Sequence, residues 1–148
     1  MELPYRIIEH TADTGLEAFG KTLPEAFVNA AKGMFSILVS KVHSHENDFK
    51  NNSCAEKSFS IEVFADSKEE LLVGWLNKLL FLWDAEQVVF YDFEILKLDN
   101  FSLFANAKGE LLNPQKHKVK TYIKAATYYQ TLIREKGDKV LVRVFFDV

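Results

Sequence analysis

The sequence has little of what marks a secreted, membrane-spanning or disulfide-stabilised protein. It contains one cysteine, Cys54, so no intramolecular disulfide can form. It has no apolar run of about 18 residues, which argues against a transmembrane helix. The first residues also lack the basic stretch and apolar run of a signal peptide. These absences predict a cytoplasmic protein with no membrane partner.

An excess of basic charge is also missing. The formal net charge is −3, whereas nucleic-acid-binding domains are usually basic. Any RNA contact is therefore expected to be local or made indirectly, through a partner. The sequence has no glycine-rich phosphate loop, no G-x-S-x-G elbow and no dinucleotide-binding fingerprint.

What the sequence does have is apolar and aromatic content. Hydrophobic residues make up 48% of 148 positions, and 13 of them are phenylalanine. This composition is typical of a globular protein and argues against disorder. With no linker or internal repeat, residues 1–148 are predicted to form a single domain around one core.

Two segments carry helix-start signals. Thr22 to Glu25 combines a capping threonine, a proline in the first turn and a glutamate three residues on, and apolar residues follow at helical spacing to Leu38. Ser67 to Glu70 offers a second capping box. The stripe after it includes Trp75 and Trp83, so this helix is expected to be buried.

The remaining regular segments predict strands. They are Leu3–Glu9, Leu16–Gly20, Phe59–Ala65, Val88–Ile95, Phe101–Ala107, Val119–Ile133 and Lys139–Phe146. Turns at Lys108-Gly109 and Lys136-Gly137-Asp138 favour antiparallel pairing, and the polar stretch Lys41–Lys57 predicts a long surface loop. We therefore predict an α+β fold, a single-domain layered sandwich in which two main helices pack on one face of a largely antiparallel sheet.

The segment Val119–Ile133 has two different faces if it is one strand. One face would carry Lys118, Lys120, Tyr122, Lys124, Ala126 and Tyr128, and the other Val119, Thr121, Ile123, Ala125, Thr127 and Tyr129. The second face suits a core. The first is either a basic stripe that contacts phosphates or an acidic partner, or the solvated face of an antiparallel sheet.

Two acidic segments stand near the ends of the chain. A polar loop from His10 to Gly15 contains Asp13, and the sequence ends on Asp147-Val148. If these meet, two side-chain carboxylates and the terminal carboxylate converge, which suits a hard cation or raises a pKa. The alternatives are an Asx turn at Asp13 and an ordinary exposed Asp147. His10 alone is more often structural than a ligand or a base.

Other candidate sites are weaker. His43 and His45 form an H-x-H pair with Glu46 and Asp48 nearby, but nothing completes a zinc site. Cys54 has no signature of a catalytic nucleophile.

Taken together, the segments resemble the archease family over almost the whole chain. The residues that carry the resemblance are His10 to Gly15 with Gly20, Thr22 to Phe27, Glu70 to Leu80, Gly109-Glu110, Lys124 to Tyr128 and Asp147-Val148. Tyr129 stands where many relatives have histidine, and Thr14 where relatives often have an aliphatic residue. No role is transferred to the loop Lys41–Lys57.

The resemblance implies an accessory protein, not an enzyme. Archeases are cofactors of RtcB-type RNA ligases, which act in tRNA splicing and RNA repair, and they promote guanylylation and multiple turnover of the ligase. The resemblance implies a divalent cation, calcium in the simplest case, bound by Asp13, Asp147 and Val148. It would also explain why the sequence stops at Val148, because a terminal carboxylate can be a ligand only if nothing follows it. Lys124, Tyr128 and His10 would contact the partner or support the site.

Two other functions stay open from the sequence. The same carboxylates, with His10 as a general base, would suit a metal-dependent phosphoester hydrolase. Alternatively, the chain is a chaperone or scaffold for RNA-modifying proteins, in which the cation only joins the two ends of the chain.

Overall fold

The computed structural model describes residues 3–9, 14–42 and 56–148. In chain order the elements are β1 (Tyr5–Glu9), β2 (Thr14–Gly20), α1 (Leu23–Leu38), β3 (Val39–Lys41), β4 (Glu56–Phe64), α3 (Lys68–Glu86), β5 (Val88–Leu98), β6 (Ser102–Leu111), β7 (His117–Val119), β8 (Ala125–Lys136) and β9 (Lys139–Asp147). Within these ranges the sheets have the orders β1-β2-β9-β8, β3-β7 and β4-β6-β5, and all pairings are antiparallel. The predicted α+β class is confirmed.

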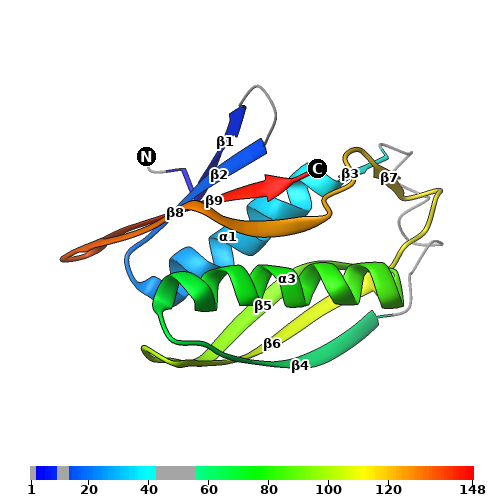
Figure 1. Ribbon diagram of the computed structural model, residues 1–148. Coiled ribbons are helices and arrows are strands. Elements are labelled where there is room, and N and C mark those ends of the chain that lie inside the picture. Colours follow the sequence, from blue (N-terminus) through cyan, green and yellow to red (C-terminus); the bar gives the residue numbers. More distant parts are fainter. Residues whose placement is uncertain (1–2, 10–13, 43–55) are drawn as a thin grey trace.

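The two helices lie between two sheets, not on one face of a single sheet (Figure 1). Helix α1 packs against β2 and β9 on one side and β5 on the other, and α3 contacts β8, β4 and β5. Trp75 of α3 is fully buried; its Nε1 donates to the Phe27 carbonyl at 3.0 Å and its ring meets Phe93 edge-on. The prediction of one sheet was wrong because periodicity shows that a helix face is apolar, but not how many sheets cover it.

Both helix starts are capped as predicted. The Thr22 hydroxyl accepts from the Glu25 amide at 3.2 Å, and the Ser67 hydroxyl accepts from the Glu70 amide at 3.1 Å. In addition, the Glu70 carboxylate accepts from the amide of Asp66 at 2.9 Å. The two hydroxyl bonds satisfy amides that a helix leaves without a partner, and the Glu70 bond fixes the residue before the N-cap.

Two predicted boundaries are wrong. Lys108-Gly109 is not a turn but part of β6, which runs on to Leu111 between β4 and β5; a Cβ at Gly109 would collide with the backbone of β5. The predicted strand Val119–Ile133 is interrupted, since β7 ends at Val119 and β8 begins at Ala125. Both errors concern contacts between segments distant in sequence, which local patterns do not report.

The turn between β8 and β9 is confirmed. Lys136 pairs with Lys139, and Gly137 between them has a φ of 63°, a left-handed conformation that glycine adopts without strain. None of the helices in the described ranges has the length and apolarity needed to cross a membrane.

Candidate functional site

The end of β9 lies between the starts of β2 and β8. Thr14 pairs with Phe146 on one side, and Ala125 pairs with Asp147 on the other. The backbone amide of Lys124 donates to the Asp147 carbonyl at 2.8 Å. We call this end of the sheet the C-terminal edge, formed by Thr14, Lys124, Ala125, Phe146, Asp147 and Val148.

The predicted cation ligands fall only partly within the described residues. His10 and Asp13 lie outside them, whereas Asp147 and Val148 are exposed at the end of β9. In the described ranges no hydrogen bond or ion pair occupies the Asp147 carboxylate, and no group of three or more His, Cys, Asp or Glu side chains forms a metal site. The three-carboxylate site therefore stays a prediction.

Asn77 of α3 anchors the start of β8. Its Nδ2 donates to the Ala126 carbonyl at 3.1 Å, and its Oδ1 accepts from the Ala126 amide at 2.7 Å. This pair of bonds satisfies both backbone groups of Ala126, which is buried. Asn77 was part of the family pattern, but its role was not predicted, because its partner is 49 positions away.

Gly15 and Phe145 form the packing next to the C-terminal edge. They pair across β2 and β9, and a Cβ at Gly15 would lie 2.6 Å from the Phe145 ring. Tyr129 also packs against this ring, edge-on at a centroid distance of 5.8 Å. The tyrosine that replaces the histidine of many relatives therefore contributes packing.

The predicted basic stripe is only partly formed. Lys118, Lys120, Tyr122 and Lys124 are exposed, and Tyr128 is 63% exposed, but Ala126 is buried and faces the core. The alternation fails for two reasons. The chain leaves the sheets between β7 and β8, and β8 has a bulge between Thr127 and Leu132 that includes Gln130 at a φ of 51°.

A hollow of about 300 Å³ adjoins the C-terminal edge. Lys124 and Ala125 line it on the strand side, and Asn77 and Phe81 line it on the α3 side. Phe81 is 62% exposed, and the Lys78 ammonium lies 5.8 Å from the centre of its ring. Lys124 therefore stands between the end of β9 and a partly apolar surface.

A buried polar cluster holds the segment that leads to this edge. Glu110 accepts from Lys116 Nζ and bonds His117 Nε2, each at 2.8 Å, and the Asn113 amide donates to His117 Nδ1 at 3.0 Å. His117 is thus the tautomer with its proton on Nε2. Burial by itself would raise the pKa of Glu110, but the hydrogen bonds from Lys116 and His117 and the lysine charge hold it below its ordinary value.

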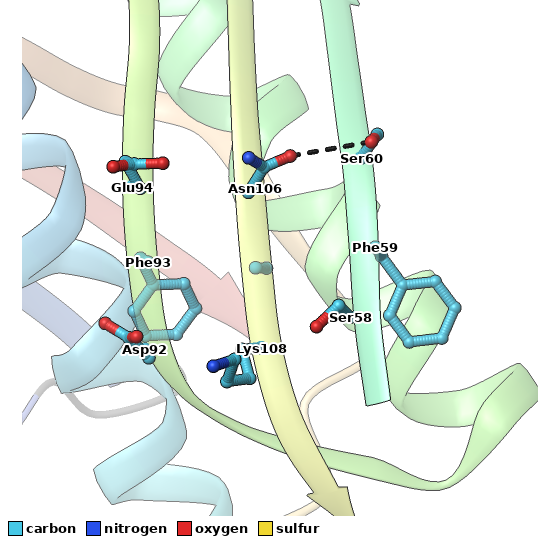
Figure 2. Close-up of a pocket in the computed structure, with 9 residues that line it drawn as sticks. Ser58, Phe59, Ser60, Asp92, Phe93, Glu94, Asn106 and Lys108 are labelled. Atoms are coloured by element: carbon cyan, nitrogen blue, oxygen red, sulfur yellow. Dashed lines mark hydrogen bonds between the residues drawn. The ribbon is translucent and has the colours of Figure 1, made fainter. Parts of the chain in front are cut away.

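The outer face of the three-stranded sheet is a second hollow, of about 570 Å³ (Figure 2). Glu94, Asn106 and Ser60 form one row across β5, β6 and β4, and Asp92, Lys108 and Ser58 form the next. The Ser60 hydroxyl contacts Asn106 at 3.5 Å, and none of the described residues that line the hollow is a histidine or a cysteine.

Within residues 56–148, this outer face has acidic and hydroxyl groups but no nucleophile with an adjacent base, which hydrolysis of a phosphoester would need. Lys108 is engaged with Glu56 at 3.5 Å. The hydrolase alternative gains no residue here, and the base that it needs, His10, lies outside the described residues.

Comparison with known proteins gives one consistent result. Residues 5–148 match the model of the Archease protein family (MTH1598/TM1083). "Protein archease" of Thermococcus kodakarensis is 40% identical over 135 residues, 88% of this chain and 87% of that protein. "Protein archease" of Sulfolobus acidocaldarius is 31% identical over 145 residues, 97% and 98% of the two chains.

Solved structures agree with the sequence matches. The solution structure of Methanobacterium thermoautotrophicum protein 1598 is similar, with a TM-score of 0.72 and 29% identity over 98% of this chain and 99% of that one. The crystal structure of "an archease, possible chaperone" from Thermotoga maritima shares the fold, with a TM-score of 0.61 and 21% identity over 100% and 98% of the two chains. With the family pattern matched from β1 to the end of β9, the chain belongs to the archease family.

Proposed function

We propose that this archease-family protein activates an RtcB-type RNA ligase in tRNA splicing or RNA repair, as a protein cofactor and not as an enzyme. A divalent cation, calcium in the simplest case, is bound by Asp13, Asp147 and the C-terminal carboxylate of Val148. The observation that supports this most is the register of the sheet, in which Thr14 pairs with Phe146.

The register pairs the sequence neighbours of two of the proposed ligands. Asp13 precedes Thr14 and Asp147 follows Phe146, so each acidic residue is one position from the Thr14–Phe146 pair. Consecutive Cα atoms are about 3.8 Å apart. The Asp147 carbonyl is already used by the Lys124 amide, which leaves its side-chain carboxylate for a cation. Carboxylate oxygens are the ligands that Ca²⁺ and Mg²⁺ prefer.

In the complex the cation would act on phosphate charge. When bound, it stabilises negative charge that develops on the nucleoside triphosphate during guanylylation of the ligase. Lys124 and Tyr128, both exposed beside the C-terminal edge, contact the ligase, and His10 supports the site. RNA is reached through the ligase at this end of the sheet.

The first test mixes the protein with its cognate ligase, GTP and a divalent cation. We expect faster guanylylation and multiple turnover with the wild-type protein, and neither with Asp13→Ala, which is expected to stay folded by circular dichroism. If two folded proteins show no increase in guanylylation or turnover, activation of the ligase is rejected.

A second test addresses the end of the chain. Two residues added after Val148 replace its carboxylate by a neutral amide, so cation binding measured by calorimetry should weaken while the melting temperature without cation stays the same. Equal affinities of the extended and unextended proteins would remove Val148 from the ligand set.

One other candidate function is that of a chaperone, because the Thermotoga maritima archease of the same fold is described as a possible chaperone. In that case the cation only joins β2 to β9, and ligase activation and thermal stability should fall in proportion in Asp13→Ala. Loss of activation in a protein of unchanged stability would instead support the cofactor role.

A further inference from the structure

The outer face of the four-stranded sheet collects basic side chains at the end opposite the C-terminal edge. Paired residues share a face of a sheet, and so do residues two apart on one strand. The three rows on this face are Arg6–Glu17–Arg143–Leu132, Phe19–Leu141–Arg134 and Lys139–Lys136. The intervening residues Val140, Val142 and Val144 are buried on the helix side, so these rows point away from the core.

The rows surround a cavity of about 530 Å³. We call it the hairpin-end cavity; it is lined by Leu3, Arg6, Phe19, Gly20, Arg134, Lys136, Lys139, Val140 and Leu141. Leu3 precedes β1, and the other residues come from β1, β2 and the β8–β9 hairpin. The tip of this hairpin extends to the left in Figure 1, away from the C-terminus. The volume is within the range of small-molecule sites.

The charges around the cavity are not balanced. Among the described residues the three rows hold five cations, Arg6, Arg134, Lys136, Lys139 and Arg143, and one carboxylate, Glu17. Asp138 stands in the turn between the two lysines, and Asp147 lies on the same face at the C-terminal edge. Glu17 is 8% exposed and forms its ion pair with Arg6. In the same ranges no carboxylate is paired with Arg134, Lys136 or Lys139, in a chain whose net charge is −3.

Lys136 and Lys139 add a specific cost. They stand directly opposite each other in the last pair of the hairpin, and like charges at such positions destabilise a sheet. An anion bound between them would remove this repulsion. Two lysines and the forked guanidinium of Arg134 are the groups that bind phosphate oxygens most effectively.

The floor of the cavity is apolar. Phe19 and Leu141 are half-buried neighbours in the second row, and Leu3 at the rim is 61% exposed. A free phosphate would use only the cations and leave this surface in contact with water. A ligand that combines phosphate with a planar apolar group would cover both, since a base can stack or pack on aromatic and aliphatic side chains.

We propose that the hairpin-end cavity binds a phosphate-bearing nucleotide, either free or as part of a single-stranded RNA, with phosphate on Lys136, Lys139 and Arg134 and the base over Phe19. This site does not depend on the proposed ligase activation. It is six residue steps along β9 from Phe146 to Val140, about 20 Å from the C-terminal edge, and its tests use the protein alone.

The experiment measures binding of a fluorescein-labelled single-stranded RNA of about ten nucleotides by fluorescence anisotropy at several salt concentrations. The double variant Lys136→Gln/Lys139→Gln should bind at least about 10-fold more weakly at low salt, and its salt dependence should fall by about one unit of slope for each lysine that contacts a phosphate. Its melting temperature should be equal or higher, because the like-charge pair is gone.

The matched control is Lys32→Gln/Lys57→Gln, which removes the same charge from exposed positions on α1 and β4 that do not line the cavity. We expect its affinity to stay within about 2-fold of wild type, an allowance for the loss of long-range attraction alone. Equal losses in the two double variants would overturn the proposal, and so would the absence of RNA and ATP binding to the wild-type protein at low salt.

Competition separates the sources of the ligand. Displacement of the labelled RNA by ATP at concentrations where inorganic phosphate has no effect supports a site that reads the base as well as the phosphate, and Leu3→Ser should reduce that difference. Binding of RNA that ATP does not displace supports an RNA strand as the ligand. Displacement by poly-glutamate as effective as by unlabelled RNA would overturn the proposal in favour of an acidic protein segment.

Discussion

The two ends of the four-stranded sheet differ in charge and in how their side chains are held. At the C-terminal edge an exposed Asp147 stands on a backbone that is fixed by the Lys124 amide and, through Ala126, by Asn77. At the hairpin-end cavity, Lys136 and Lys139 repel each other across a turn. The ends are about 20 Å apart, twice the Debye length of about 10 Å at 0.1 M salt, so two charges of opposite sign coexist without neutralising each other.

The largest expected effect comes from removing charge at one end and not at the other. If Asp147 is a cation ligand as proposed, Asp147→Asn should reduce cation affinity at least about 100-fold, because a ligand contributes more than the groups that only orient it. The proposed ligase activation should be lost with it. Asp138→Asn, in the hairpin turn at the other end, removes the same charge and should change neither. Similar losses in both variants, measured by calorimetry and guanylylation, would show that only net charge matters.

The next effect tests the support of the C-terminal edge. Asn77→Ala leaves the buried amide and carbonyl of Ala126 without the partners that they have now, at a cost of about 1–3 kcal/mol for each group. Urea denaturation should show this loss of unfolding free energy, together with weaker cation binding. Asn106→Ala, on the exposed face of β6, should cost less than about 0.5 kcal/mol. Equal losses in the two variants would mean that the hydrogen bonds between Asn77 and Ala126 do not stabilise the fold.

A smaller effect separates two glycines, one at each end. Gly15→Ala would place a Cβ 2.6 Å from the Phe145 ring and should cost about 1–3 kcal/mol by overpacking. Gly137→Ala meets nothing within 4 Å, and its cost of about 1–2 kcal/mol comes from the left-handed backbone. Asparagine tolerates that backbone, so Gly137→Asn should be more stable than Gly137→Ala. At position 15 the larger side chain overpacks more, so Gly15→Asn should be less stable than Gly15→Ala. The reverse order of melting temperatures at either position would contradict this account.

The smallest effect depends on pH. Because the folded protein lowers the pKa of Glu110, the ionised carboxylate contributes stability above the ordinary carboxyl pKa of about 4.3 and loses it as the pH falls through the folded value. Urea midpoints should therefore drop in the acid range in wild type and drop less in Glu110→Gln. Glu94→Gln, at an exposed position on β5, serves as the control. If the urea midpoints of Glu94→Gln changed with pH in the same way as those of Glu110→Gln, the loss of stability in acid could not be assigned to Glu110.

Features that depend on neighbours in sequence were predictable. The caps at Thr22 and Ser67, the buried stripe with Trp75 and the glycine turn at 137 were all expected, and all are present. Three features were not expected: the strand pair β3–β7, the continuation of β6 through Lys108-Gly109, and the hydrogen bonds from Asn77 to Ala126. Each of these joins segments that are far apart in the chain, and no periodicity reports such a contact.

The candidate site divides in the same way. Asp147 and Lys124 were predicted as site residues from the family pattern, and the sheet brings the backbone of both to one edge, while Asp13 and His10 stay predictions outside the described residues. The hairpin-end cavity was not predicted at all. Its cations lie on β1, at the end of β8 and at the start of β9, and in a sequence of net negative charge they form no basic run.

The sequence by itself determined the local structure of this protein, because capping, helical periodicity and turn conformation depend on residues within about four positions of one another. The tertiary structure decided which segments share an edge. Burial of β2 and β9 against α1 sets a register that places Thr14 beside Phe146 and Phe19 beside Leu141, and a slip of one residue would turn every buried valine of β9 toward water. That register separates an acidic end of the sheet from a basic one.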